Sequence, residues 1–256
     1  MKPSLSASAL KYLALATMLL DHMAYYLSLP EPLRWVGRLA APIFLFFVVE
    51  GFAHTRSYSR YLLRVYAVGL TMGIANELLR RFAGDFRADG ITPTNSICAT
   101  FFLLLLILQG LKMTAQRRWA GILLLVGPFA LPLLLDAVLP QHISTLLQTT
   151  LLPSPYYCEG GTELLMIGVL LYFFRRDKSK QLTVYIIGCL VLYLTPVVLL
   201  GGFSVLFIYY QWMMVFAAIP LAIYNGQRGH APRWLFYWFY PVHVYLLWAL
   251  GALLGR

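Results

Sequence analysis

Long apolar stretches dominate this chain, and short polar segments separate them. About nine of the stretches approach the twenty residues that a helix needs to cross a bilayer core of about 30 Å. These stretches lie near Ala7–Leu27, Leu33–Phe52, Tyr61–Leu79, Ser96–Leu111, Trp119–Leu139, Thr162–Phe174, Gln181–Leu200, Phe203–Tyr224 and Trp234–Leu254. The pattern predicts an all-α, polytopic integral membrane protein with about nine transmembrane helices, within a range of about eight to ten.

The region before the sixth stretch is ambiguous. Thr162–Phe174 is short, and it follows Ile143–Leu152, which is too short to cross by itself. This region is therefore expected to hold either a re-entrant segment or a tenth pass. No Gly/Ser linker, charged tail or internal repeat divides residues 1–256, so the sequence predicts a single transmembrane domain.

Composition and charge support a membrane location. Hydrophobic residues make up 60% of the chain and charged residues only 12%, about half the fraction of a soluble domain. The net charge of +10 comes from basic clusters in short connections between apolar stretches, which indicates topology rather than nucleic-acid binding. These clusters are Arg56/Arg60/Arg64, Lys112/Arg117/Arg118, Arg175/Arg176/Lys178/Lys180 and Arg228/Arg233. The positive-inside rule places them, and the N-terminus, in the cytoplasm. The three cysteines have no metal-binding spacing, so no metal is expected.

The first apolar stretch carries three ionisable residues, Lys11, Asp21 and His22. Such residues are costly in a membrane and usually face a protein interior or a water-filled cavity. Lys11 and His22 are eleven residues apart, nearly three helical turns, so they share one helix face with an axial separation of about 16 Å. Asp21 points about 100° away from His22, so its partner is expected on another helix.

The second stretch supplies possible partners. It runs back across the membrane, which places Arg38 at the depth of Asp21 and Glu50 at the depth of Lys11. Two ion pairs follow, Asp21–Arg38 and Lys11–Glu50, and one interpretation is that they serve only to neutralise buried charge.

Two histidines lie within the apolar stretches. His22, next to a carboxylate and near an arginine, has the chemistry of a general base or nucleophile. His243 lies near the middle of the last stretch, where a structural histidine and a second active-site base are both open interpretations.

Arg56, Arg60 and Arg64 are spaced four residues apart before the third stretch. They serve either as a topology signal or as a binding site for phosphates at the cytoplasmic side. A pantetheine arm has about the length that separates Lys11 from His22. An acyl-CoA whose phosphates bind at the basic cluster could therefore bring its thioester near His22.

Several motifs also resemble the TraX family of bacterial membrane proteins. They are Lys11 ten residues before Asp21-His22, Gly37-Arg-Leu-Ala-Ala-Pro-Ile-Phe44, Glu50-Gly-Phe-Ala-His-Thr-Arg56 and Phe239-Tyr-Pro-Val-His243. TraX of conjugative plasmids is associated with N-terminal acetylation of pilin, and the lysine-to-histidine element is similar to that of membrane acyltransferases that acetylate polysaccharides. The resemblance implies acetyl transfer, with Lys11, Asp21, His22, Arg38 and His243 as the positions carried over.

The sequence and the resemblance together predict an acetyl-CoA-dependent N- or O-acetyltransferase of the bacterial inner membrane. His22, oriented by Asp21 or its neighbours, would take a proton from the acceptor or become transiently acetylated. Arg38 would stabilise the oxyanion or keep Asp21 ionised, and Lys11 with Arg56, Arg60 and Arg64 would bind the CoA phosphates. The acceptor would be an envelope component, either pilin, a glycan or a lipid-linked molecule.

Two alternatives remain open. One is a proton-coupled transporter with a relay of Lys11, Asp21, His22, Glu50 and His243, although no inverted repeat is visible. The other is an assembly partner, in contact with membrane lipids, whose buried charges only pair.

Overall fold

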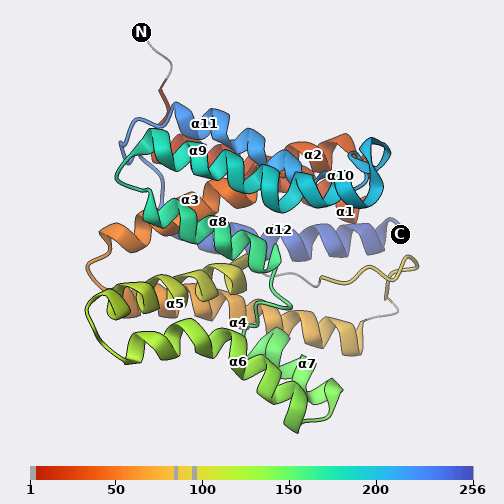
Figure 1. Ribbon diagram of the computed structural model, residues 1–256. Helices are drawn as coiled ribbons and strands as arrows, with labels where there is room; N and C mark the ends of the chain where they lie inside the picture. The colour runs from red at the N-terminus through yellow and green to blue at the C-terminus, as the bar shows by residue number, and fades with distance from the viewer. Residues whose placement is uncertain (1–3, 84–85, 94–96, 256) are drawn as a thin grey trace. The chain divides into compact units, whose positions relative to one another are not determined.

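Helices form nearly all the regular structure of the protein. The computed structural model describes residues 4–83, 86–93 and 97–255 (Figure 1). Its α-helices are α1 (Ala7–Tyr26), α2 (Pro32–Gly37), α3 (Ala40–His54), α4 (Tyr58–Phe82), α5 (Ile97–Ala115), α6 (Ala120–Val138), α7 (Gln141–Thr150), α8 (Gly161–Phe173), α9 (Lys178–Cys189), α10 (Thr195–Gly201), α11 (Ala218–Ala222) and α12 (Arg233–Leu253). A π-helical turn, η2 (Leu190–Leu194), joins α9 to α10, and two 3₁₀ segments, η3 (Phe203–Val205) and η4 (Tyr210–Ala217), precede α11. The predicted all-α fold is confirmed.

Several of these helices could cross a membrane. By length and composition alone, six stretches of the described chain qualify, namely Pro32–His54, Tyr58–Phe82, Ile97–Ala115, Ala120–Val138, Lys178–Leu199 and Trp234–Leu253. The 20-residue helix α1 is not among them, although its length is sufficient. The predicted polytopic membrane character is supported, and the number of nine spans stays a prediction.

The eighth predicted span does not form the single helix that the sequence predicted. Instead of one α-helix over Phe203–Tyr224, the chain forms 3₁₀ segments followed by the five-residue α11. Gly202 has a φ of 66°, a left-handed conformation that glycine adopts readily, and it ends α10 there. The apolar composition was read correctly, but it does not by itself specify a continuous helix.

The chain divides into two compact units. Unit 1 comprises Met1–Phe47, Arg87–Ile91 and Phe173–Arg256, and unit 2 comprises Val48–Phe86 and Thr92–Tyr172. In unit 1, α1 packs against α2 and α12, while α9 packs against α11 and η4. The sequence-based assignment of a single domain stays a prediction.

The start of α1 is fixed to the loop that follows α11. Ser6 caps the helix, because its side chain accepts a hydrogen bond from the backbone N–H of Ala9. The backbone N–H of Leu5 donates to the Ile223 carbonyl, and the Ser8 hydroxyl donates to the Arg228 carbonyl. This polar network sets the axial position of α1 within unit 1.

Arg87 fixes the other end of α1. Its side chain is fully buried, and its guanidinium donates to the carbonyl of Tyr26, the last residue of α1, at 2.9 Å and to the Trp248 carbonyl of α12 at 3.1 Å. Gly251 leaves room for it, since a Cβ atom there would collide with the Arg87 guanidinium and lie 2.6 Å from the Tyr26 oxygen. One buried arginine therefore ties α1 to α12.

Asp89 balances the buried charge. Its two carboxylate oxygens accept hydrogen bonds from Nε and Nη2 of Arg87 at 2.9 and 2.6 Å. These hydrogen bonds lower the pKa of the Asp89 carboxyl to about 2. The stability that the pair contributes is thus fully present above the ordinary aspartate pKa of about 3.9, and it is lost as the pH falls through about 2.

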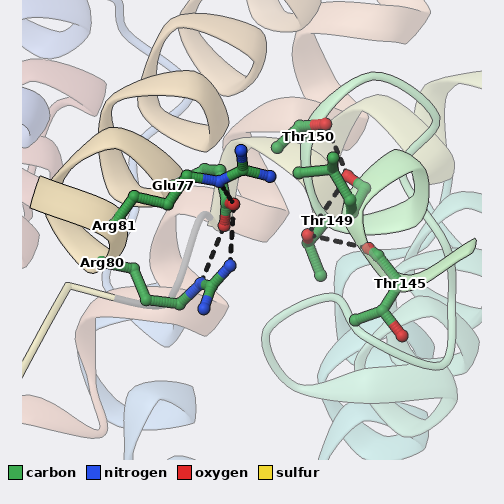
Figure 2. Close-up of polar contacts among 7 residues, drawn as sticks. Glu77, Arg80, Arg81, Thr145, Thr149 and Thr150 are labelled. Atoms are coloured by element: carbon green, nitrogen blue, oxygen red, sulfur yellow. Dashed lines mark hydrogen bonds and ion pairs between the residues drawn. The ribbon is translucent and has the colours of Figure 1, made fainter. Parts of the chain in front are cut away.

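Unit 2 is built from α4 to α8, with α5 packed between α4 and α6. Helix α7 lies close to α4 at Gly73. A Cβ atom at this position would lie 2.9 Å from the Thr149 carbonyl oxygen, so the lack of a side chain permits the close approach. Figure 2 shows polar groups of both helices in this region, with Glu77 of α4 held between the guanidinium groups of Arg80 and Arg81. Both arginines are more than half exposed, so this ion-pair cluster contributes little to stability.

Arg87 is expected to be far more important for stability than an exposed arginine. Replacing Arg87 with Met leaves two carbonyls without their donor and leaves the Asp89 carboxylate with only the backbone N–H of Ile91 among its described donors. It should lower the free energy of unfolding by about 3 kcal/mol. The matched control, Arg81→Met, leaves Glu77 paired with Arg80 and should cost less than about 1 kcal/mol. Unfolding in detergent micelles measures both, and equal losses would contradict the role of Arg87 as a clamp.

Candidate functional site

The two intramembrane histidines meet. Nδ1 of His22, on α1, lies 2.7 Å from Nε2 of His243, on α12. The ring centroids are 4.8 Å apart and the ring planes differ by 14°, as expected when the nitrogens of two nearly coplanar imidazoles face each other. Tyr26 and Tyr240 border the His22 ring, so the pair lies in an aromatic environment.

The hydrogen bonds of His243 define where the protons lie. Its Nδ1 is 2.6 Å from the Phe239 carbonyl oxygen, which can only accept, so Nδ1 carries a hydrogen. In the neutral ring, Nε2 of His243 is then an acceptor, and Nδ1 of His22 must donate to it. A neutral His22 therefore keeps an unprotonated Nε2, which has the lone pair that a general base or nucleophile requires.

Asp21 lies beside His22 in sequence but has different partners. Its Oδ2 accepts a hydrogen bond from Nη2 of Arg38 at 2.5 Å, which confirms the predicted Asp21–Arg38 pair. Arg38 also donates to the Gln211 side chain at 2.9 Å and to the Arg34 carbonyl at 3.3 Å. Among the described residues no contact joins Asp21 to the His22 ring, and the hydrogen bond to that ring comes from His243. The expectation that Asp21 or its neighbours orient His22 for catalysis stays a prediction.

Gly37 makes the Asp21–Arg38 pair possible. A Cβ atom at Gly37 would collide with the Asp21 side chain and lie 2.8 Å from its Cγ atom. The backbone of α2 therefore lies directly against α1, and Arg38, the next residue, reaches the carboxylate. The motif Gly37-Arg38 thus has a steric explanation.

Lys11 lies farther along α1, against aromatic rings. Its Nζ atom is 4.9 Å from the centroid of the Phe47 ring and 5.3 Å from that of Phe236, which are cation–π distances. Glu50 belongs to unit 2, where its carboxylate lies 3.8 Å from Nδ1 of His54. The predicted Lys11–Glu50 pair joins the two units and stays a prediction.

The predicted basic stripe is only partly helical. Helix α4 begins at Tyr58, so Arg60 and Arg64 share a helix, whereas Arg56 precedes it. All three arginines are exposed, and Nε of Arg64 donates to the Arg60 carbonyl. They belong to unit 2 and Lys11 to unit 1, so their joint binding of a donor stays a prediction.

Two arginines of this region were not recognised from the sequence. Arg34 lies on α2, four residues before Arg38, and its Nε is 3.7 Å from Oδ1 of Asp21. The i, i+4 spacing with Arg38 was a usable signal, because it places both side chains on one helix face. Arg87 lies in a connection between helices, and nothing in the local sequence indicates that it is buried.

Comparison with known proteins agrees with these motifs. The model of the TraX protein family matches residues 6–251. A relative from Dichelobacter nodosus, the probable fimbrial assembly protein FimC of serogroup H1, is 27% identical over 260 residues, which cover 94% of this chain and 94% of the relative. No solved structure matches the chain. Since the family match spans nearly the whole sequence, including the Lys11, Asp21-His22, Arg38 and His243 positions, the chain belongs to the TraX family.

Proposed function

We propose that the protein is a membrane acetyltransferase that moves an acetyl group from acetyl-CoA to an amine or hydroxyl of an envelope acceptor. The observation that carries the proposal is the hydrogen-bonded chain of His22, His243 and the Phe239 carbonyl, which leaves Nε2 of a neutral His22 unprotonated. Acyl transfer needs a base at the acceptor, and this nitrogen can supply it.

In the proposed reaction, His22 moves one proton. The acceptor nitrogen or oxygen attacks the thioester carbonyl as Nε2 of His22 takes its proton, and the carbon–sulfur bond then breaks. The protonated Nε2 returns the proton to the CoA sulfur, so the products are the acetylated acceptor and CoA. Transient acetylation of Nε2 before the acceptor attacks has the same overall balance and stays open.

His243 would stabilise the charged form of His22. When Nε2 of His22 gains a proton, Nδ1–H still donates to Nε2 of His243, which accepts part of the positive charge. This function resembles that of the buried carboxylate in a catalytic triad, which holds its histidine in the required tautomer. Arg38 is already bound to Asp21 and Gln211, so it would act as a fixed positive charge toward a developing oxyanion.

The donor would enter from the cytoplasm. In the proposed topology of nine spans, with the N-terminus inside, Lys11 lies toward the cytoplasmic end of α1 and His22 about 16 Å farther along its axis. Lys11, Arg56, Arg60 and Arg64 would bind the phosphates of CoA, and the pantetheine arm would extend along α1 toward His22.

The acceptor would be a component of the bacterial envelope, reached from the inner membrane. The Dichelobacter nodosus relative has a name that refers to fimbrial assembly, which favours a pilin or fimbrial subunit. A glycan or a lipid-linked molecule stays open.

Replacing His22 tests the base. His22→Ala should reduce acetyl transfer by about 10²–10⁴-fold, the usual contribution of a general base, with little loss of folded protein. Mass spectrometry of envelope proteins, glycans and lipids after isotopic acetate labelling measures the transfer. His142→Ala, an exposed histidine of α7, is the matched control and should transfer normally. If His22→Ala transferred acetyl groups at the wild-type rate, the mechanism would be excluded. If no envelope protein, glycan or lipid carried acetyl groups that depend on the wild-type protein, a transporter would be favoured.

His243 should respond according to hydrogen-bond chemistry. His243→Gln keeps an acceptor for Nδ1–H of His22 and should retain more transfer than His243→Ala, which removes that acceptor. The ratio of the two rates, measured at equal amounts of folded protein, is the relevant quantity. Equal rates would show that His243 does not act through the His22 tautomer.

Donor binding depends on the cytoplasmic cations. Lys11→Met keeps the contacts with Phe47 and Phe236 but removes the charge, and Arg60→Gln removes a guanidinium. Each should weaken CoA binding to the purified protein by about tenfold, as expected for one charged hydrogen bond. The control is Arg118→Gln, an exposed arginine in another connection, which should bind CoA normally. Unchanged CoA binding by Lys11→Met and Arg60→Gln would leave these residues as topology signals only.

A further inference from the structure

Arg34 is held in position by aromatic rings. Its Cζ atom lies 5.1 Å from the centroid of the Tyr25 ring on α1 and 5.6 Å from that of the Tyr210 ring at the start of η4. Three separate elements therefore meet at this guanidinium. The side chain is one-third exposed, so the group is oriented but still accessible.

The hydrogen-bonding capacity of Arg34 is unused. No described residue accepts a hydrogen bond from its side chain, and its buried Nε lies 3.7 Å from Asp21, beyond hydrogen-bonding distance. Arg38 differs, because its three nitrogens donate to Asp21, Gln211 and the Arg34 carbonyl. The guanidinium of Arg38 is thus hydrogen-bonded, whereas that of Arg34, one helical turn away, donates to no described residue.

The local charges also leave Arg34 without a full partner. Asp21 is one carboxylate facing two guanidinium groups, and among the described residues only Arg38 donates a hydrogen bond to it. Glu31, at the start of α2, is exposed and forms no ion pair with either arginine in the described part of the chain. A cation in this environment is stabilised by an additional anion.

The unused donors lie near the reactive histidine. Arg34 contacts Asp21 and Tyr25 of α1, which lie one residue before and three residues after His22 in the sequence. A guanidinium fork binds carboxylates and phosphates through two parallel hydrogen bonds, and a lysine cannot reproduce that geometry. An oxyanion bound at Arg34 would therefore be held beside the place where the acceptor must react.

We propose that Arg34, supported by Tyr25 and Tyr210, is the recognition residue for an oxyanion of the acceptor, and that it selects acidic acceptors for transfer at His22. The identity of this ligand as the acceptor rests on the proposed acetyltransferase function, whereas oxyanion binding at Arg34 does not depend on that function. The oxyanion would be either a carboxylate, as in a peptide or an acidic sugar, or a phosphate, as in a lipid-linked glycan.

Simple oxyanions test the binding directly. The midpoint of thermal unfolding of the purified full-length protein is followed while sodium phosphate or sodium acetate replaces sodium chloride at constant ionic strength. Wild type should show a saturable rise with at least one of the two anions. Arg34→Gln should raise the half-saturating concentration by about tenfold, and Arg34→Lys, which keeps the charge but not the fork, should fall between them. The anion with the lower half-saturating concentration identifies the source as carboxylate or phosphate.

Two controls make the result specific. Arg118→Gln, which removes an exposed arginine elsewhere, should respond as wild type does. Because the proposed donor site also binds phosphate, the phosphate titration is repeated in Lys11→Met, where the effect of Arg34 should persist. No saturable rise in wild type, or equal half-saturation in wild type and Arg34→Gln, would overturn the proposal.

Acetyl transfer separates this inference from the function on which it rests. Arg34→Gln should raise the KM for the acceptor and leave kcat nearly unchanged, whereas His22→Ala should lower kcat. If His22→Ala did not lower kcat, the proposed function would be overturned, but the oxyanion titration would still test binding at Arg34. If the KM for the acceptor were unchanged in Arg34→Gln while His22→Ala still lowered kcat, only the claim that Arg34 selects the acceptor would be overturned.

Discussion

The hydrogen bond between His22 and His243 is the interaction on which the candidate site depends, because it joins α1 to α12 through two residues that are 221 positions apart in sequence. In a membrane, a polar side chain without a partner is costly, so each histidine strongly favours the arrangement that supplies the other. Arg87 binds the same two helices at Tyr26 and Trp248, about 6 to 8 Å along the axes from the histidines. A short axial shift of α1 against α12 would break both contacts together.

The buried charges of unit 1 are divided between separate tasks. Arg87 is fully enclosed and paired with Asp89, which suits a structural clamp. Arg38 is bound to Asp21 and Gln211, which fixes the position of its charge. Arg34 is oriented by aromatic rings and has unused donors, which suits a ligand. The number of donors already engaged, and not the residue type, distinguishes the three arginines.

The sequence predicted those features that depend on local pattern or on depth in the membrane. Helix positions followed from apolar length, and the Asp21–Arg38 pair followed from the similar depth of two oppositely charged residues on consecutive spans. The contact of His22 with His243 could not be derived, because depth does not reveal which helices are neighbours. Arg87 was missed because a connecting segment gives no periodicity from which burial can be inferred. The break over Phe203–Tyr224 was missed because hydropathy measures composition and is insensitive to a backbone turn such as that at Gly202.

Helix α1 has the properties that a donor-binding element would need in the proposed reaction. Lys11 and His22 lie on one face, and both contact α12, Lys11 through Phe236 and His22 through His243. The aromatic contacts of Lys11 hold a cation at one end of α1, while the histidine pair keeps a lone pair at the other. The separation of the two groups is set by helix rise alone, about 16 Å, so it is rigid. A donor with a charged head and a reactive end at a similar separation would match both groups, and a shorter acyl donor would reach only one. The same rigidity explains why clamping α1 at both ends, by Ser6 and Arg87, would matter for chemistry as well as for folding.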